Sequence, residues 1–293
     1  MNIYDLLNKN SALLRGKKIA ISGSTGGLGK EICFVLAKYK ADLILMDRNE
    51  QKVDLLCSEI FKNFGEVNIT KIKLDLSDFG LVKSATEKLK EISPDILILN
   101  AGAYSIPRKK CDTGLDNVFQ INFAAPYYIV KELLPTLKEK NGRVVAVGSI
   151  AHNYSKLDLN DVDFSTRKKS SLAYGNAKRF LIFSLFELFK GEKEATLSVV
   201  HPGITFTGIT NHYPKLIFAL IKHPMKIIFM KPKKAALCII NGIFEATDYH
   251  SWIGPKIFNV WGLPKNKCLK TCSKEESEKI YLKAEEIYKT IKY

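Results

Sequence analysis

Tyr174 and Lys178 are the pair of side chains in this sequence that could most directly perform chemistry. They are four residues apart in an expected helix, Leu172 to Phe189, so both side chains lie on one helix face. A tyrosine hydroxyl has an ordinary pKa of about 10, and a neighbouring ammonium group favours its ionised form. The pair could therefore exchange a proton with a substrate at neutral pH. This spacing is common by chance, so the surrounding sequence must decide its meaning.

A turn with four glycines is the second chemical feature. It lies between an apolar run, Lys18 to Ser22, and an expected helix, Lys30 to Lys40. Glycines permit a tight turn and let the backbone approach a pyrophosphate, which the free N–H groups of the following helix can bind. We predict that this turn binds the phosphates of a dinucleotide through Gly23, Ser24, Thr25, Gly27, Leu28 and Gly29.

Acidic side chains follow the next two expected strands. Asp47 comes after the run Leu43 to Met46 and could accept hydrogen bonds from the ribose hydroxyls of NAD, whereas Arg48 could pair with the 2′-phosphate of NADP. Asp47 would repel that phosphate and the glycine turn has no basic residue, so the sequence favours NAD and leaves NADP open. Asp75, with Leu76, could contact the adenine, and capping of the next helix is the alternative for Asp75.

These residues need elements that bring them together, and the chain alternates short apolar runs with amphipathic segments. The expected strands are 18–22, 43–46, 72–76, 95–99, 143–147 and 196–200, and the helices are 30–40, 51–64, 81–92, 119–138 and 172–189. Such alternation predicts an α/β fold with a doubly wound, mostly parallel sheet of the Rossmann type. Ligands bind there at the carboxyl ends of the strands, which the glycine turn, Asp47, Asp75, Asn100 to Gly102, Ser149 and His201 to Thr207 all follow.

With these motifs in this order, residues 15 to 210 resemble the short-chain dehydrogenase/reductase family, and most of all its retinol-dehydrogenase-like branch. The glycine turn is similar to the family motif T-G-x-x-x-G-x-G, with Ser22 in place of Thr. Ser149 matches the catalytic serine, although Gly148 stands where a second serine is usual. The other matches are Asn100-Ala101-Gly102, Asn122, the Tyr174 and Lys178 pair, and Pro202-Gly203 with Thr207.

The resemblance implies hydride transfer between NAD(P) and an alcohol or carbonyl compound. Tyr174 would be the general acid/base, Lys178 would lower its pKa and hold the nicotinamide ribose, Ser149 would bind the reacting oxygen, and Asn122 would hold a water relay. A dinucleotide-sensing regulator without turnover is the alternative, although such sensors are expected to lose the tyrosine and lysine. Further cofactor contacts would come from Asn100, Ala101, Gly102, Tyr174, Lys178, Pro202, Gly203, Thr205 and Thr207.

The substrate side is expected to be apolar, because the branch that the chain resembles acts on apolar alcohols and ketones. A small helical lid is expected over about residues 208–234. Its segment 213–232 combines apolar residues with four lysines, so contact with an anionic membrane surface is an alternative to a lid packed on its own core. His152 and His201 are interpreted as loop residues that bond the backbone.

Composition limits the remaining choices. The 293 residues are expected to form a single domain, 1–293, with a further strand after a turn in 251–262 and an amphipathic closing helix over 274–293, which could mediate a homo-oligomer. The net charge of +15 comes from 39 lysines but only six arginines, spread without a nucleic-acid motif, so no nucleic-acid partner is expected.

Location and metal content follow from the same composition. Six cysteines without framework spacing indicate free thiols in a reducing compartment, and no metal site is expected. The sequence has neither a leader pattern nor an apolar span. We therefore expect a cytoplasmic protein, with attachment to a membrane surface as the open alternative.

Overall fold

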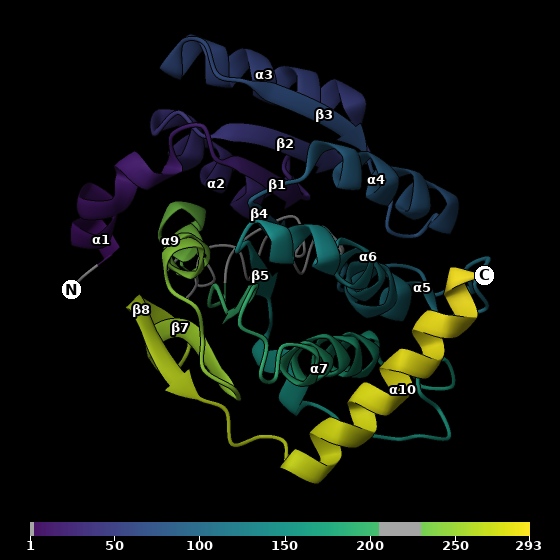
Figure 1. The fold of residues 1–293 in the computed structure, drawn as a ribbon. Coiled ribbons are helices and arrows are strands. Elements are labelled where there is room, and N and C mark those ends of the chain that lie inside the picture. Colours follow the sequence, from purple (N-terminus) through teal and green to yellow (C-terminus); the bar gives the residue numbers. More distant parts are fainter. Residues whose placement is uncertain (1–2, 205–229) are drawn as a thin grey trace, which may run out of the picture.

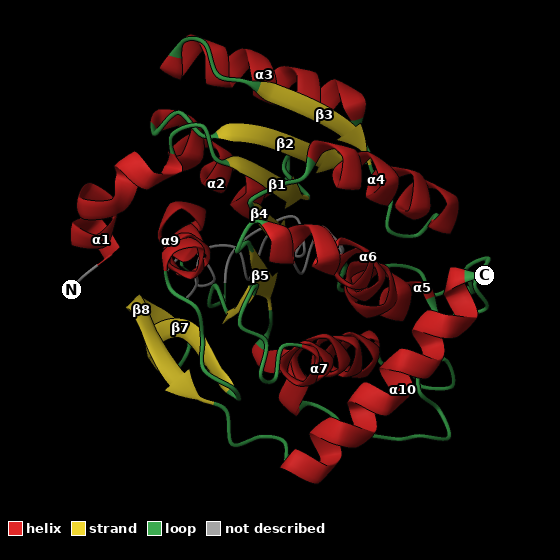
Figure 2. Cartoon of the chain, in the orientation of Figure 1, coloured by secondary structure: helices red, strands yellow, loops and turns green. Residues whose placement is uncertain are grey.

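The computed structural model describes residues 3–204 and 230–293. Within these ranges eight strands form one sheet in the order β3-β2-β1-β4-β5-β6-β7-β8. All neighbours are parallel except β7 and β8, which form an antiparallel pair (Figure 1, Figure 2). This is the predicted doubly wound, Rossmann-type arrangement. The strands are β1 Lys18–Ser22, β2 Asp42–Asp47, β3 Ile69–Lys73, β4 Ile96–Leu99, β5 Arg143–Val147, β6 Thr196–Val200, β7 Ser251–Ile257 and β8 Trp261–Cys268.

The central strands β1, β4, β5 and β6 are buried along nearly their whole length, which is why they are continuous apolar runs in the sequence. Three of them begin and end at the predicted residues. The prediction for β3 is wrong by three residues, because the strand is Ile69–Lys73 and not 72–76. Leu74 and Leu76 are buried by packing in the core after the strand has ended, so burial there did not indicate strand pairing.

Helices cover both faces of the sheet (Figure 1). One apolar core lies between the sheet and α2, α3 and α9, and the other between the sheet and α4, α6 and α7. The helices are α1 Ile3–Asn10, α2 Gly27–Lys38, α3 Glu50–Phe64, α4 Phe79–Ile92, α5 Asn117–Phe119, α6 Ala125–Glu139, α7 Ser170–Leu188, α9 Pro232–Phe244 and α10 Lys274–Lys292, with shorter turns η1 Ser11–Leu14, η2 Gln120–Ala124 and η3 Ile150–Asn153.

Two predictions about the second half of the chain need correction. The expected lid, 208–234, lies mostly outside the described residues, but its end is wrong, because Pro232 is the first residue of α9 and this helix packs against α2 and the sheet. Proline suits the first turn of a helix, where its missing N–H has no partner to lose. The segment 251–262 contains not one strand but the start of a hairpin, β7 and β8.

The closing helix α10 folds back on its own chain. Its apolar residues Ile280, Ala284, Ile287 and Ile291 are buried, and the helix crosses the outer side of α7 and α6 (Figure 1). The face that suggested an oligomer is therefore occupied within the chain, and the oligomer stays a prediction.

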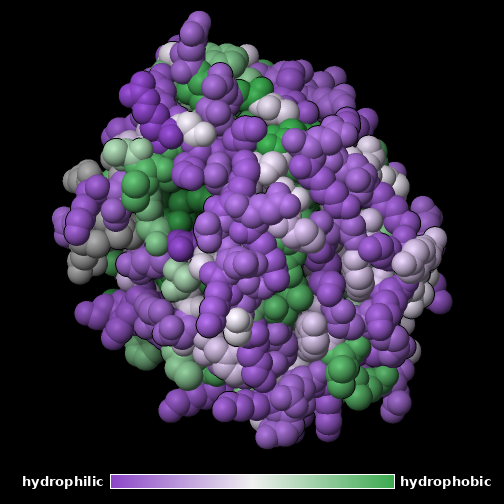
Figure 3. Space-filling model, in the orientation of Figure 1, coloured by the Kyte–Doolittle hydropathy of each residue, from purple (hydrophilic) through white to green (hydrophobic). Residues whose placement is uncertain are grey.

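The surface that Figure 3 shows is mostly polar, and the thiols in the described residues are free. Figure 3 shows that hydrophilic side chains cover most of the visible face, with small apolar patches between them. The six cysteines are unpaired, and Cys33, Cys57 and Cys238 are buried in α2, α3 and α9. In 3–204 and 230–293 no helix has the length and apolar character of a membrane span. The same ranges contain no cluster of three or more His, Cys, Asp or Glu side chains suited to a metal ion.

Candidate active site

The glycine turn leads from β1 into α2 and lines a cavity of about 440 Å³. A methyl group on Gly29 would lie 2.1 Å from the carbonyl oxygen of Gly23, so only glycine lets the helix begin this close to the turn. No side chain in the described part of the chain caps α2, whose first residue is Gly27. Its first N–H groups can therefore bind a phosphate, and the cradle fits the predicted dinucleotide.

Asn100 ties the end of β4 to the glycine turn. Its Nδ2 atom donates hydrogen bonds to the carbonyl oxygens of Ser22 and Gly23, each at 3.1 Å. The Ser22 hydroxyl in turn accepts from the N–H groups of Asn100 at 3.1 Å and Ala101 at 3.0 Å. Ser22 thus makes these two backbone contacts although the family motif has threonine there, and Asn100, Ala101 and Gly102 line the cavity as predicted.

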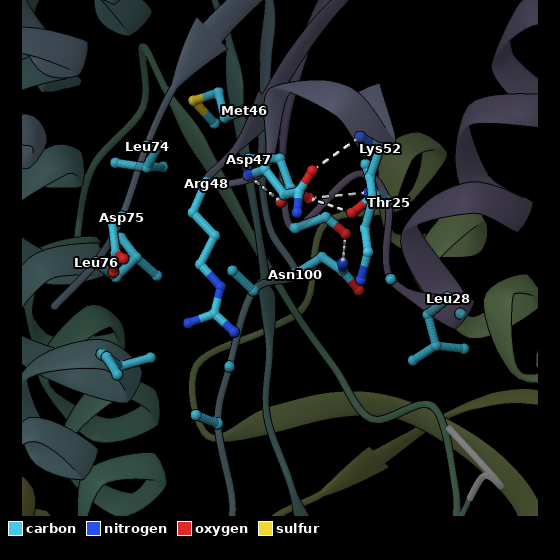
Figure 4. Close-up of a pocket in the computed structure, with 18 of the residues that line it drawn as sticks. Thr25, Leu28, Met46, Asp47, Arg48, Lys52, Leu74, Asp75, Leu76 and Asn100 are labelled. Carbon is cyan, nitrogen blue, oxygen red and sulfur yellow. Dashed lines mark hydrogen bonds between the residues drawn. The ribbon is translucent and has the colours of Figure 1, made fainter. Parts of the chain in front are cut away.

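Asp47 lies at the end of β2 on the wall of the same cavity. Its Oδ2 atom accepts from the N–H of Thr25 at 3.0 Å and from the Thr25 hydroxyl at 2.8 Å, which fixes the carboxylate against the glycine turn (Figure 4). The side chain of Arg48 extends along the cavity in the same view. Lys52, in the first turn of α3, also lines it. The cavity wall here therefore carries one negative and two positive groups.

Asp75 and Leu76 also line this cavity. The Asp75 carboxylate accepts from the N–H and the hydroxyl of Ser77 at 2.9 and 2.7 Å. The residue that caps α4 is Asp78, which accepts from the N–H of Leu81 at 3.0 Å. Asp75 holds the turn before the helix and stays at the cavity, so the capping alternative applies to Asp78 instead.

Lys178 and Asn122 lie where the cavity reaches Gly102. A methyl group on Gly102 would be 2.8 Å from Asn122 Oδ1 and 3.8 Å from Lys178 Nζ. Both side chains are buried. Asn122 is oriented by two hydrogen bonds to the Ala103 backbone: its Oδ1 accepts from the N–H at 3.2 Å, and its Nδ2 donates to the carbonyl oxygen at 2.7 Å. Lys178 Nζ donates to the carbonyl oxygen of Val147 at 2.8 Å. The structure thus brings two predicted catalytic residues to the end of the predicted cofactor cavity.

Tyr174 and Ser149 lie beside each other. The Lys178 ammonium is 5.9 Å from the centre of the Tyr174 ring, in agreement with a shared helix face. Burial raises the pKa of Tyr174 to about 12, and a hydrogen bond with the Ser149 side chain opposes this rise. Burial also lowers the pKa of Lys178 to about 8. We expected Lys178 to lower the pKa of Tyr174, but the pKa shift has the opposite direction, because burial outweighs the other contributions.

Several predicted contacts lie elsewhere. Ser24 and Gly29 are buried behind the glycine turn, and Pro202 and Gly203 are buried after β6, so none of these four is among the residues that line the cavity. Thr205, Thr207 and the segment 213–232 up to residue 229 lie outside the described residues.

Other residues at the site were missed by sequence reasoning. Lys52 could have been found, because it lies four residues after Arg48 in the first turn of the expected helix. Tyr104 packs edge to face on Tyr174, with ring centres 5.1 Å apart. No spacing pattern identifies it, since it lies in the loop after β4. The cavity is also lined by Gly26, Met46, Asn49, Leu74, Ala103, Ile106 and Ile121.

Known proteins resemble this chain in both sequence and fold. The family model for short chain dehydrogenases matches residues 17–160. Retinol dehydrogenase 12 of Mus musculus is 32% identical over 67% of this chain, but the chain spans only 64% of that protein. Retinol dehydrogenase 12 of Bos taurus is 30% identical, with 84% of this chain and 82% of that protein covered. A short-chain dehydrogenase from Sphingobium yanoikuyae, solved in complex with NADPH, has a TM-score of 0.60 at 20% identity over 78% of this chain and 84% of its own.

Proposed function

The chain belongs to the short-chain dehydrogenase/reductase family, and from this premise we propose that it transfers a hydride between a nicotinamide dinucleotide and an apolar alcohol or carbonyl compound. One observation carries the proposal. The cavity that begins at the glycine turn reaches Gly102, beside Asn122 and Lys178, and Tyr174 with its Ser149 partner lies on the same helix face as Lys178.

The bound dinucleotide would supply or accept the hydride, and the protein would handle the proton. In carbonyl reduction, the Ser149 hydroxyl would hold the carbonyl oxygen and Tyr174 would donate its proton to that oxygen. A Tyr174 pKa of about 12 keeps the phenol protonated at neutral pH, which suits the acid in the reductive direction. Lys178 is largely an ammonium group below its pKa of about 8 and could hold a ribose hydroxyl, with Asn122 beside it.

An apolar substrate is supported by the surroundings of Tyr174. Its ring packs in a cluster with Ile106, Leu172 and the buried residues Val118 and Phe164. Tyr104 adds a second aromatic wall. Such surroundings favour an apolar molecule that carries one polar oxygen. The relatives named for retinol, an apolar alcohol, point in the same direction.

We also propose a preference for NAD over NADP. Thr25 holds the Asp47 carboxylate at the cavity wall, where its remaining lone pairs could accept ribose hydroxyls and its charge would repel a 2′-phosphate. Arg48 and Lys52 act against this repulsion. We therefore expect the preference to be modest, about tenfold in kcat/KM, which corresponds to about 1.4 kcal/mol.

The experiment that tests the proposal is a turnover assay on the purified protein. The absorbance of the reduced nicotinamide is followed over a panel of apolar alcohols and ketones, with NAD(H) and NADP(H) in parallel. Turnover with at least one member, faster with the NAD pair, is the expected result. Dinucleotide binding without turnover on any member would instead support the sensing regulator.

A further inference from the structure

His152 connects the catalytic serine to the C-terminal part of the chain. It lies in η3, three residues after Ser149, and its side chain is fully buried. Its Nδ1 atom is 2.6 Å from the carbonyl oxygen of Ser149, and its Nε2 atom is 2.8 Å from the hydroxyl oxygen of Thr271. The contact with Thr271 joins residues that are 119 positions apart in the sequence.

The chemistry of the two contacts determines the state of the ring. A carbonyl oxygen can only accept a hydrogen bond, so Nδ1 carries the proton. Burial lowers the pKa of His152 to about 4, so the ring is neutral near pH 7 and its Nε2 atom accepts a hydrogen bond from the Thr271 hydroxyl. Nδ1 therefore donates to the Ser149 carbonyl oxygen, and Nε2 accepts from the Thr271 hydroxyl.

Arg179 holds the same two segments. Its guanidinium group donates to the carbonyl oxygen of His152 at 3.2 Å and to that of Thr271 at 2.8 Å. It also forms an ion pair with Glu276 in the first turn of α10, at 2.7 Å. Because the Arg179 side chain is only 5% exposed, this pair is shielded from solvent on the arginine side. The His152 contact is thus part of a buried connection between η3, α7 and the start of α10.

The position of η3 bears directly on the reacting groups. The Ser149 hydroxyl accepts from the N–H of Ala151 at 3.2 Å, and it also faces Tyr174. A methyl group on Gly175, the residue after Tyr174, would lie 2.2 Å from the Ala151 carbonyl oxygen. The short turn that carries Ser149 therefore packs directly on the turn of α7 that carries Tyr174. A small shift of η3 would change the geometry between the serine and tyrosine hydroxyls.

We propose that His152 is a positioning residue, which bridges the Ser149 carbonyl and Thr271 and so fixes the Ser149 hydroxyl beside Tyr174. Turnover then depends on the connection between β8 and α10, which holds Ser149 through His152. This inference rests on the function proposed above, and it adds a residue that works through Ser149.

Two substitutions at this position separate positioning from packing. His152→Phe keeps a ring against Trp252, whose centre is 5.3 Å from that of the histidine, but removes both hydrogen bonds. His152→Asn loses the ring packing but has an amide N–H that can donate to the Ser149 carbonyl. We expect kcat to fall about tenfold in His152→Phe and about threefold in His152→Asn, because a hydrogen bond contributes on this scale. The KM for the dinucleotide should not change in either variant.

Two further variants test the outer contact of the bridge and provide a control. Thr271→Val removes only the outer hydrogen bond, and a decrease in kcat of about threefold is expected. His250→Phe alters another buried histidine, which packs on Phe183 as His152 does and contacts Ser277, but makes no hydrogen bond to η3 among the described residues. It should lower the unfolding temperature and leave kcat unchanged.

The outcomes separate the inference from the proposed function. A kcat for His152→Phe equal to that of the wild type, or kcat values that simply follow the unfolding temperatures of the four variants, would overturn the positioning role. If the wild-type protein itself shows no turnover, the proposed function fails. Nitrogen-15 NMR of labelled histidine then tests the bridge alone. An Nδ1–H tautomer at His152 is expected in the wild type and in Thr271→Val, with a shifted Nε2 resonance in the variant because the hydrogen bond from Thr271 is lost. An Nε2–H tautomer in the wild type, or an Nε2 resonance that does not shift, contradicts the bridge.

Discussion

The two ends of the crevice are built in different ways. At the cofactor end, the glycine turn, Asp47 and Asn100 are held by backbone groups and short hydrogen bonds at neighbouring strand ends. At the catalytic end, Ser149 and Tyr174 depend on a buried network that reaches Thr271 and α10. The cofactor end is therefore held by contacts between adjacent strand ends of the sheet, and the catalytic end by contacts of η3 and α7 with the segment that leads into α10.

Because the two ends are held differently, substitutions at each end should change a different kinetic or binding constant. A substitution in the glycine turn changes the shape of the cavity wall that would bind the phosphates. It should therefore weaken dinucleotide affinity and leave kcat nearly unchanged. A change around Ser149 alters the orientation of buried groups and should affect kcat with little effect on affinity. If the two ends are independent, substitutions at one end change dinucleotide affinity and substitutions at the other change kcat.

The largest effect is expected for Tyr174→Phe, which removes the acid and leaves the ring contact with Tyr104 in place. General acid catalysis contributes on the scale of 100- to 10,000-fold, so kcat should fall by about 1,000-fold. The dinucleotide Kd, measured by calorimetry, should stay within about twofold, which is about 0.4 kcal/mol. An equal loss of both quantities would show that the two ends are not separate.

Gly29→Ala changes the cofactor end. The added methyl would lie 2.1 Å from the Gly23 carbonyl oxygen, so the turn must move, and overpacking of this kind costs about 1–3 kcal/mol. We expect the dinucleotide Kd to rise by about 100-fold, or about 2.7 kcal/mol. Gly80→Ala in α4 is the control, because Gly80 lies outside the residues that line the cavity and its methyl would lie 3.3 Å from the Asp78 carboxylate. Equal Kd values for the two variants would exclude the steric explanation.

Asp47→Ala tests whether the Asp47 carboxylate sets the preference for NAD over NADP. It removes the carboxylate that Thr25 holds and leaves Arg48 and Lys52 at the cavity. The ratio of kcat/KM with NAD to that with NADP should fall by about tenfold or more, since hydrogen bonds to charged groups contribute about 1.5–3 kcal/mol. A ratio that does not change would place the ribose away from Asp47.

The smallest effect concerns pH. Burial lowers the pKa of Lys178 to about 8, so the folded protein loses the ammonium as pH rises through this value, while Tyr174 keeps its proton. We expect kcat/KM for carbonyl reduction to be halved near pH 8. The unfolded chain keeps its lysine proton to about pH 10.4, so the contribution of this group to stability rises between these pH values. A midpoint near pH 10 would contradict the account.

Sequence reasoning located residues that lie next to the end of a regular strand or on one helix face. The glycine turn, Asp47 and Asn100 line the cavity, and Tyr174 and Lys178 share a helix face. Their roles stay predictions. The predicted bounds of β3 were three residues too late, because Leu74 and Leu76 are buried in the core but belong to no strand. Helix α9 was missed although Pro232 and the apolar run after it are a start signal.

The bridge from His152 to Thr271 could not be predicted. Its partners are 119 residues apart, and no periodicity or motif relates them, because the contact is set by how α10 crosses α7. The pKa of Tyr174 was beyond sequence reasoning for a related reason. Its direction is decided by burial in the folded chain, and not by the lysine four residues away.

The central claim is that hydride passes between the nicotinamide and the carbonyl carbon. It is tested most directly with a reduced dinucleotide that carries deuterium on the transferring face of nicotinamide C4, incubated with the wild-type protein and a ketone from the panel. Mass spectrometry of the product should show one deuterium on the carbinol carbon of the alcohol. An alcohol formed without deuterium from either labelled face would contradict the account.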